Sequence, residues 1–197
     1  MYNKNEILSA LNEMKLDDYM ELSKIPDIDL YMDQIITLFD KNLGENKRTE
    51  EDKLLTKTMI NNYAKDKLLM APDKKKYTKE HIILMCIIYN LKQSLSIQDI
   101  KKLFNPMIAN FEDENLKEDE KKKLSKLYES FYEIKKNEIE DNLKNIEEKI
   151  NNINNMESDD YGKVFITVLI LIYSANIQRK LAERMIDKFL ICENDEK

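Results

Sequence analysis

The stretch that decides the fold reads Thr56-Lys57-Thr58-Met59-Ile60-Asn61-Asn62-Tyr63-Ala64-Lys65. On a helical wheel, its residues divide into an apolar and a polar side. The apolar side, which can pack on a supporting helix, comprises Met59, Ile60 and Tyr63. The polar side comprises Lys57, Thr58, Asn61, Asn62 and Lys65. This division predicts a short amphipathic helix that presents hydrogen-bonding groups to its surroundings.

The residue types on the polar side suit the recognition of DNA bases. Asparagine can form two hydrogen bonds with adenine, and lysine can reach guanine or a phosphate. An ordinary solvated helix face would look similar, although it would normally carry glutamate as well. The wheel alone therefore leaves both interpretations open.

A basic turn follows this predicted helix, because Pro72 and the run Lys74-Lys75-Lys76-Tyr77 exclude a continued helix. Thr78 can then cap a helix that extends to Lys92. Its centre is an unbroken apolar run over residues 82–89, which we expect in the middle of the local core. The basic turn is either a simple exposed turn or a wing that contacts a nucleic-acid backbone.

Helical spacing of apolar residues extends through most of the chain, which has only two glycines and three prolines. We expect helices at residues 5–14, from an Asp29 cap to about 43, and from Ser96 to a point before Pro106. Residues 117–155 repeat apolar positions in steps of three and four, as in a coiled-coil seam or a long bundle helix. A last helix, from Asp160 to Ile191, is apolar nearly all round in its first half, so we expect other helices to bury it.

Charge is unevenly distributed along the chain. The net charge of −6 argues against a general nucleic-acid binder. Residues 56–79, however, hold seven lysines and two aspartates, a net charge of +5. Residues 112–160 hold sixteen acidic residues and nine lysines, a net charge of −7. The sequence therefore contains a basic island, residues 56–79, within an acidic chain.

Catalytic, metal-binding and membrane motifs are not visible in the sequence. Cys86 and Cys192 are too far apart in sequence to suggest a disulfide framework or zinc site; we interpret Cys86 as a core residue and leave the reactivity of Cys192 open. The single histidine, His81, is expected at the exposed start of a helix. The longest apolar run, residues 164–175, is shorter than a membrane span and better suits a buried helix. We therefore expect a cytoplasmic protein that is not an enzyme, without a secretion signal, cofactor, metal or membrane association.

Three segments in order resemble the MerR family of DNA-binding proteins. Residues 58–69 resemble its recognition-helix signature, with Lys67 in place of a glycine. Residues 74–81 resemble its basic wing, and residues 95–100 resemble the start of its final helix. The family's arginine and first tyrosine are replaced by Asn61 and Asn62, which puts their phosphate-contacting role in doubt.

Two further runs, residues 25–34 and 55–63, are similar to a bacterial family known as domain of unknown function 1836. That resemblance covers roughly residues 20–190 and implies a MerR-like DNA-binding fold, without indicating a target or effector.

These observations predict an all-α fold with at most a tiny β wing. We expect an N-terminal region over residues 1–110, with a MerR-like winged helix-turn-helix at about 54–104, and a C-terminal long-helix bundle over 111–197 for dimerisation or partner binding. The predicted function is transcription regulation by a homodimer on double-stranded DNA. The expected DNA-binding residues are Lys57, Thr58, Asn61, Asn62, Tyr63, Lys65, Lys74, Lys75, Lys76 and Tyr77. The alternative is a helical protein–protein interaction module that keeps the fold without binding DNA.

Overall fold

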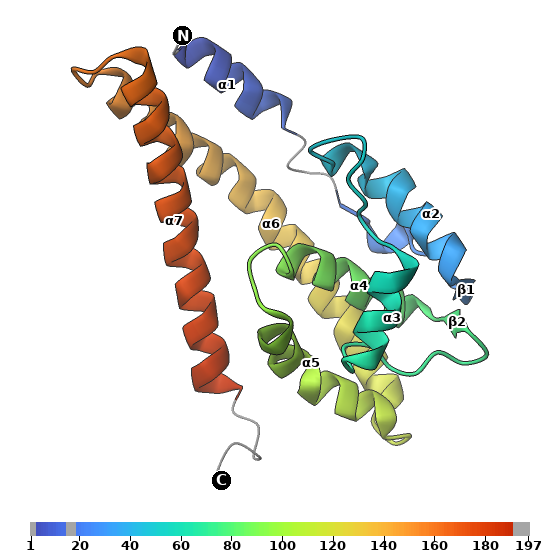
Figure 1. The fold of residues 1–197 in the computed structure, drawn as a ribbon. Coiled ribbons are helices and arrows are strands. Elements are labelled where there is room, and N and C mark those ends of the chain that lie inside the picture. The colour runs from blue at the N-terminus through green and yellow to red at the C-terminus, as the bar shows by residue number, and fades with distance from the viewer. Residues whose placement is uncertain (1–2, 15–18, 191–197) are drawn as a thin grey trace. The chain divides into compact units, whose positions relative to one another are not determined.

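A computed structural model describes residues 3–14 and 19–190 of the chain (Figure 1). The elements in chain order are α1 (Lys4–Glu13), a 3-10 turn (Leu22–Lys24), β1 (Leu30–Tyr31), α2 (Met32–Leu43), a 3-10 turn (Gly44–Asn46), α3 (Lys57–Lys65), β2 (Lys76–Tyr77), α4 (Lys79–Leu91), α5 (Ile97–Glu112), α6 (Lys117–Asn154) and α7 (Asp160–Phe189). The two strands pair antiparallel in a single small sheet. The prediction of an all-α fold with a tiny β element is confirmed.

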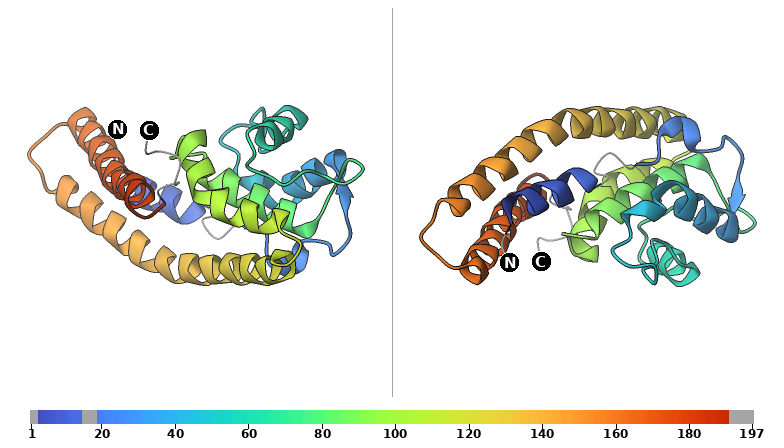
Figure 2. Two further views of the ribbon diagram at one scale, coloured as in Figure 1. Left: turned by 90° about the horizontal axis from the view of Figure 1, so that it is seen from below. Right: turned by 90° about the horizontal axis from the view of Figure 1, so that it is seen from above.

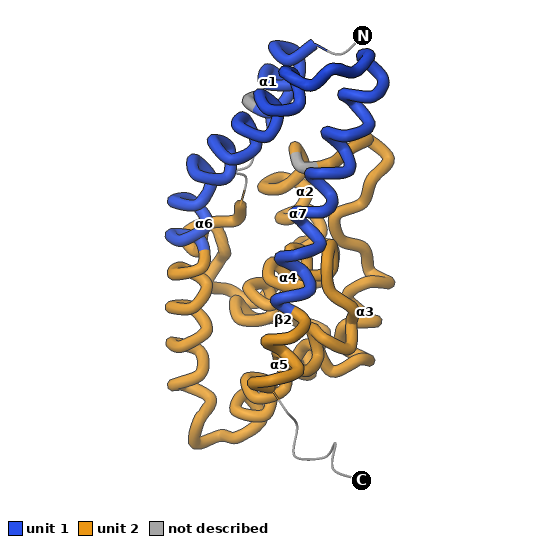
Figure 3. Tube along the Cα trace, turned by 90° about the vertical axis from the view of Figure 1, so that its left-hand side faces the viewer, with its two compact units in different colours: residues 1–17, 132–182 blue, residues 18–131, 183–197 orange. Residues whose placement is uncertain are grey.

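The chain forms two compact units (Figure 3). Unit 1 comprises residues 1–17 and 132–182, and unit 2 comprises residues 18–131 and 183–197. The boundary therefore crosses the long helices α6 and α7, whereas the sequence suggested a division between residues 110 and 111.

The core of unit 2 is built around α4. Residues 81–86 of this helix are all buried, together with Ile88, because its apolar run leaves no polar side to face water. Side chains from the surrounding elements close over it; they include Met20, Ile35, Phe39, Ile60, Ile100 and Tyr128, all at most 1% exposed. The helix predicted to lie in the middle of the local core does so.

The start of α6 is tied to the beginning of unit 2 by a buried hydrogen bond. The hydroxyl of Tyr128 donates to the carbonyl of Met20 at 2.6 Å. Cys86 lies beside them, with its Sγ 3.9 Å from the Sδ of Met20. Burial raises the pKa of the Cys86 thiol to about 12, so this residue is an unreactive part of the core, as the sequence suggested. Cys192 lies outside the described residues.

Helix starts agree with the sequence at three places. Thr78 immediately precedes α4, and its backbone N–H donates to His81 Nδ1 at 3.1 Å. The side chain of Ser96 accepts a hydrogen bond from the Asp99 N–H at 3.1 Å and begins α5. Asp159 accepts a hydrogen bond from the Gly162 N–H at 2.8 Å and so begins α7.

Two predicted helix boundaries were wrong. Asp29 does not begin α2, because Leu30 and Tyr31 first pair with β2 and the helix starts at Met32. Gln34 then accepts a hydrogen bond from the Tyr31 N–H at 2.8 Å. Pro106 does not follow α5 but lies inside it, since buried residues on both sides, Phe104 and Ile108, hold the helix in place through the proline.

Unit 1 packs α7 against α6 along one side only. Lys149 donates to Ser174 at 3.0 Å, and Lys163 donates to the carbonyl of Asn154 at 2.8 Å. Among the residues of α7 that belong to unit 1, Thr167 is buried, and the side of the helix that carries it faces α6. By length and composition, α7 could cross a membrane, and it is the one helix of the described residues that could do so.

Candidate nucleic-acid interface

Helix α3 has the two sides that its sequence predicted. Ile60 and Tyr63 are buried, and they hold α3 against the core of unit 2. The polar residues are all exposed: Lys57, Thr58, Asn61, Asn62 and Lys65. The helix therefore presents two amides, a hydroxyl and two ammonium groups on one outward face.

The C-terminus of α3 is closed by a Schellman motif, in which two backbone N–H groups bond back to the last helical carbonyls. The Leu68 N–H donates to the Tyr63 carbonyl at 2.8 Å, and the Lys67 N–H donates to the Ala64 carbonyl at 3.1 Å. Lys67 has a φ of 60°, the left-handed conformation that this motif requires and that glycine usually supplies. Position 67 is therefore occupied by a lysine in a glycine-like conformation.

Changing Lys67→Gly should stabilise the protein. Relief of the left-handed conformation, worth roughly 1–2 kcal/mol, is partly offset by the greater chain entropy of glycine, so we expect a net gain of about 0.5–1 kcal/mol. Urea unfolding followed by circular dichroism measures the change. Lys65→Gly, two residues earlier within the helix, is the matched control and should destabilise by about 0.7 kcal/mol. Destabilisation by both changes would contradict the assigned conformation.

The basic turn is a two-residue β-turn. The Lys76 N–H donates to the Asp73 carbonyl at 2.8 Å, and the central residues Lys74 and Lys75 have φ values of 47° and 65°. Positive φ at both central positions is characteristic of a type I′ turn, which normally selects Asn-Gly. Both lysines are exposed at its tip.

The base of this turn is anchored to β1 and its flanking residues. Tyr77 pairs with Leu30 and Lys76 with Tyr31, and the Lys76 ammonium lies 5.4 Å from the centre of the Tyr31 ring. Lys76 is therefore half-buried against an aromatic ring and less available than the two lysines at the tip.

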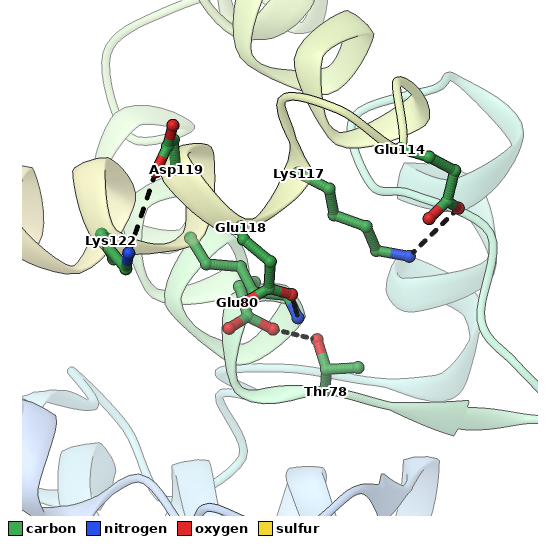
Figure 4. Close-up of polar contacts among 8 residues, drawn as sticks. Thr78, Glu80, Glu114, Lys117, Glu118, Asp119 and Lys122 are labelled. Carbon is green, nitrogen blue, oxygen red and sulfur yellow. Dashed lines mark hydrogen bonds and ion pairs between the residues drawn. The ribbon is translucent and has the colours of Figure 1, made fainter.

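His81 fixes the segment after the turn, and the prediction of an exposed histidine was wrong. Its side chain is 4% exposed; its Nδ1 accepts from the Thr78 N–H at 3.1 Å, and its Nε2 donates to the Met70 carbonyl at 3.2 Å. Burial lowers the pKa of His81, which favours this neutral form. The Thr78 hydroxyl donates to Glu80 at 2.5 Å (Figure 4). These bonds hold the turn in a fixed position at the start of α4.

Two predicted DNA-binding residues do not lie on the outward surface. Tyr63 is 5% exposed and Tyr77 is 3% exposed. Burial also raises the pKa of both phenols. Tyr77 packs edge-on against the ring of His81, with the ring centres 5.5 Å apart. Both tyrosines therefore belong to the core, because the apolar body of each ring is needed to attach α3 and the turn to it.

The lysines of the basic island differ in how far acidic groups neutralise them. Lys57 lies 2.7 Å from Asp33, and Lys79 lies 2.6 Å from Asp27. Outside the island, at the start of α6, Lys117, Lys121 and Lys122 each pair with a nearby acid, and Figure 4 labels the Glu114–Lys117 and Asp119–Lys122 pairs. Lys74 and Lys75, by contrast, have no acidic oxygen within 4.0 Å in the described part of the chain. The tip of the turn therefore carries two positive charges that no acidic group of the described residues compensates.

Helix α3 and the turn lie in the same part of unit 2. In both views of Figure 2, α3 lies on the face opposite the start of α6, and the turn before β2 projects from one end. We call the exposed face of α3, Lys67 and the two tip lysines together the basic surface. No group of three or more histidine, cysteine or acidic side chains within the described residues could hold a metal ion.

The fold and this surface place the chain among all-α proteins that carry a short two-stranded β-turn element. The chain belongs to the family described as domain of unknown function (DUF1836), whose family model matches residues 20–131. The match covers most of unit 2, including the whole basic surface. No curated protein and no solved structure matches the chain significantly.

Sequence reasoning found the outward side chains of α3 and the tip lysines, but it missed the backbone that carries them. The left-handed positions at 67, 74 and 75 are occupied by lysines instead of the glycine or asparagine that would reveal them. The Pro72-Asp73 pair was the available signal for a tight turn.

Proposed function

We propose that the protein binds double-stranded DNA through the basic surface and acts as a transcription regulator. Helix α3 would enter the major groove, where Asn61 and Asn62 can read base edges while Lys57 and Lys65 contact phosphates. Lys74 and Lys75 at the tip of the turn would contact the backbone beside it, in the manner of a wing. The regulator would be a homodimer that binds two half-sites related by two-fold symmetry.

The observation that carries this proposal is the use of lysine at three left-handed positions. Lys67, Lys74 and Lys75 all have positive φ, which is unfavourable for a residue with a β-carbon, and all three are exposed. Backbone strain of this kind persists most often where a side chain has a task that glycine could not perform. Three positive charges held on fixed backbone within one short segment suit a polyanion.

Two features support the MerR-like part of the proposal, and one feature differs from a usual helix-turn-helix. Lys67 adopts the conformation expected of the signature glycine that it replaces, and the turn before β2 has the place of the wing. However, residues 44–56 separate α2 from α3, whereas a helix-turn-helix usually has a turn of three or four residues. The proposal is therefore a MerR-like winged helix with an extended connection between its two helices.

Selection from random double-stranded DNA tests the proposed function. The full chain is mixed with a pool of duplexes, retained fragments are sequenced, and the affinity for the best duplex is measured by fluorescence anisotropy. We expect an enriched motif with two-fold symmetry and an affinity that falls with salt, with a slope of about 0.9 per phosphate contact. Absence of enrichment, together with no retention on a DNA column at low salt, would refute the proposal.

A protein-interaction module is the second candidate, and the apolar sequence of α7 favours it. Within unit 1, α7 packs on α6 along one side, so its other apolar side chains need a further protein surface. Capture of a protein from lysate by the full chain, with no retention on DNA, would favour this alternative.

A further inference from the structure

His81 joins the two ends of the segment that carries the basic turn. Its Nε2 donates at 3.2 Å to the carbonyl of Met70, which precedes the turn. Its Nδ1 accepts at 3.1 Å from the N–H of Thr78, which follows the turn. Lys74 and Lys75 lie between these two contacts. One buried imidazole ring therefore closes residues 70–78 into a loop and uses both of its nitrogens to do so.

Histidine replaces the residue that normally occupies this position of a helix. Thr78 precedes α4 and His81 is the third residue of the helix, so they stand at the two ends of a capping box. The second end is normally a glutamate or a glutamine, and either could accept from the Thr78 N–H. Neither of those side chains changes its charge between about pH 5 and 8, whereas histidine does. The choice of histidine therefore makes this cap sensitive to protons.

The two contacts require the neutral ring. A neutral imidazole has one donor and one acceptor nitrogen, whereas the protonated ring has two donors. After protonation, the Nδ1–H and the Thr78 N–H would face each other as two donors, and their bond would be lost. The Thr78 hydroxyl lies 3.0 Å from Nδ1 and could accept from it, but the Thr78 N–H would still be left without its acceptor. Protonation therefore removes the bond that fixes the backbone at the end of the turn.

The electrostatic surroundings of His81 lie within unit 2. The charged and titratable groups that act on the ring or on its acidic neighbours are Glu80 of α4, Asp29 before β1, Tyr77 of β2 and the Lys121–Glu118 pair of α6. Glu80 and Asp29 favour the protonated ring, but burial has the larger effect and lowers the pKa of His81. The unfolded chain therefore binds the proton first as the pH falls through about 6.5. The stability that the neutral ring contributes is complete above this pH and is lost below it.

We propose that His81 is a proton-sensitive clamp of the basic turn: the neutral ring holds Lys74 and Lys75 in position, and protonation releases the end of the turn at Thr78. The clamp depends only on contacts within unit 2, whereas its effect on DNA rests on the proposed function. Protonation makes the chain more positive, so charge alone would strengthen DNA binding as the pH falls. Release of the turn predicts the opposite sign.

Nuclear magnetic resonance of the full chain tests the clamp without DNA. The chain has one histidine, so every imidazole signal belongs to His81. The ring nitrogen shifts should show the Nε2–H tautomer at about pH 7.5 and the protonated ring as the pH falls towards about 5, above the ordinary range of carboxyl groups. Over the same titration, the Thr78 amide proton should lose the shift of a bonded group. The heteronuclear NOE of residues 74–76 should fall, because the turn becomes mobile.

Two variants separate the clamp from a simple role of His81 in packing. His81→Gln keeps an acceptor for Thr78 and a donor for Met70 but does not titrate, so its turn should stay ordered at both ends of the pH range. His81→Ala removes both contacts, and its turn should be mobile throughout. Circular dichroism verifies that both variants keep their helices. Order that glutamine restores, without any response to pH, is the signature of the clamp.

Fluorescence anisotropy then measures the affinity for the best duplex at constant salt, at about pH 7.5 and about pH 5.5. The unchanged chain should bind on the order of 10-fold more weakly at the lower pH, because a mobile turn loses most of the phosphate contacts of its two lysines. His81→Gln should bind equally well or more tightly at the lower pH, as its charge requires.

Three results would overturn the proposal. They are a ring that stays neutral to about pH 5, a Thr78 amide and a turn that do not change while the ring titrates, or the same response to pH in His81→Gln. If no form of the chain binds DNA at about pH 7.5, the proposed function fails, while the resonance measurements still decide whether His81 is a clamp.

Discussion

Replacing Lys74 and Lys75 together with glutamine should weaken DNA binding roughly 30-fold at 0.15 M salt, since each lost phosphate contact removes about 0.9 from the salt slope. Glutamine keeps much of the side-chain length but removes the charge. Both lysines are at the tip of the turn and have no acidic partner in the described part of the chain, so their charge is fully available. The slope of log affinity against log salt should therefore fall by about 1.8.

The matched control changes two exposed lysines of α6, Lys122 and Lys126, to glutamine. This variant has the same net charge as the turn variant, but the changes lie on the opposite face of unit 2 from α3. We expect its salt slope to equal that of the unchanged chain. If both variants lost the same affinity for DNA, binding would depend only on the net charge of the protein. The turn would then no longer be assigned as a wing.

Tyr63 and Tyr77 are the predicted DNA-binding residues whose burial could not be predicted from the sequence. The outward position of Asn61 and Lys65 follows from helical periodicity, because a face without apolar residues has no reason to be buried. Tyr63 and Tyr77 have both an apolar ring and a polar hydroxyl, so composition cannot decide between core and surface. The structure buries both because α3 and β2 are short and need large side chains to hold them.

His81 and α7 show two limits of local sequence pattern in the prediction of burial. His81 stands near a helix start, where exposure is common, but its ring nitrogens match a free N–H of Thr78 and a free carbonyl of Met70. For α7, the all-round apolar pattern indicates burial but does not say by which chain. Periodicity in one sequence cannot separate a core helix from an interface helix, since the same side chains serve both.

The lysines with positive φ show why backbone geometry was the least predictable feature. Turn prediction relies on glycine and asparagine, which tolerate left-handed conformations. Lys74 and Lys75 adopt these conformations because the bridge and the hydrogen bond between Asp73 and Lys76 require a tight turn just before β2. The sequence therefore predicted where the turn lies but not which type of β-turn it forms.

Leu84→Ala should destabilise unit 2 by about 2–5 kcal/mol, the largest effect on stability that we expect from a single truncation. Leu84 has no exposed surface and lies in the centre of α4, so the removed methyl groups would leave a cavity among closely packed neighbours.

Leu127→Ala on α6 is the control, because its side chain is 49% exposed and its truncation should cost less than about 1 kcal/mol. Urea unfolding followed by far-ultraviolet circular dichroism gives both values. Because α6 and α7 cross the boundary between the units, we expect one cooperative transition, which Leu84→Ala shifts as a whole. A second transition that keeps its original midpoint would show that unit 1 folds by itself, and a cost below 1 kcal/mol would mean that α4 is not the centre of the core.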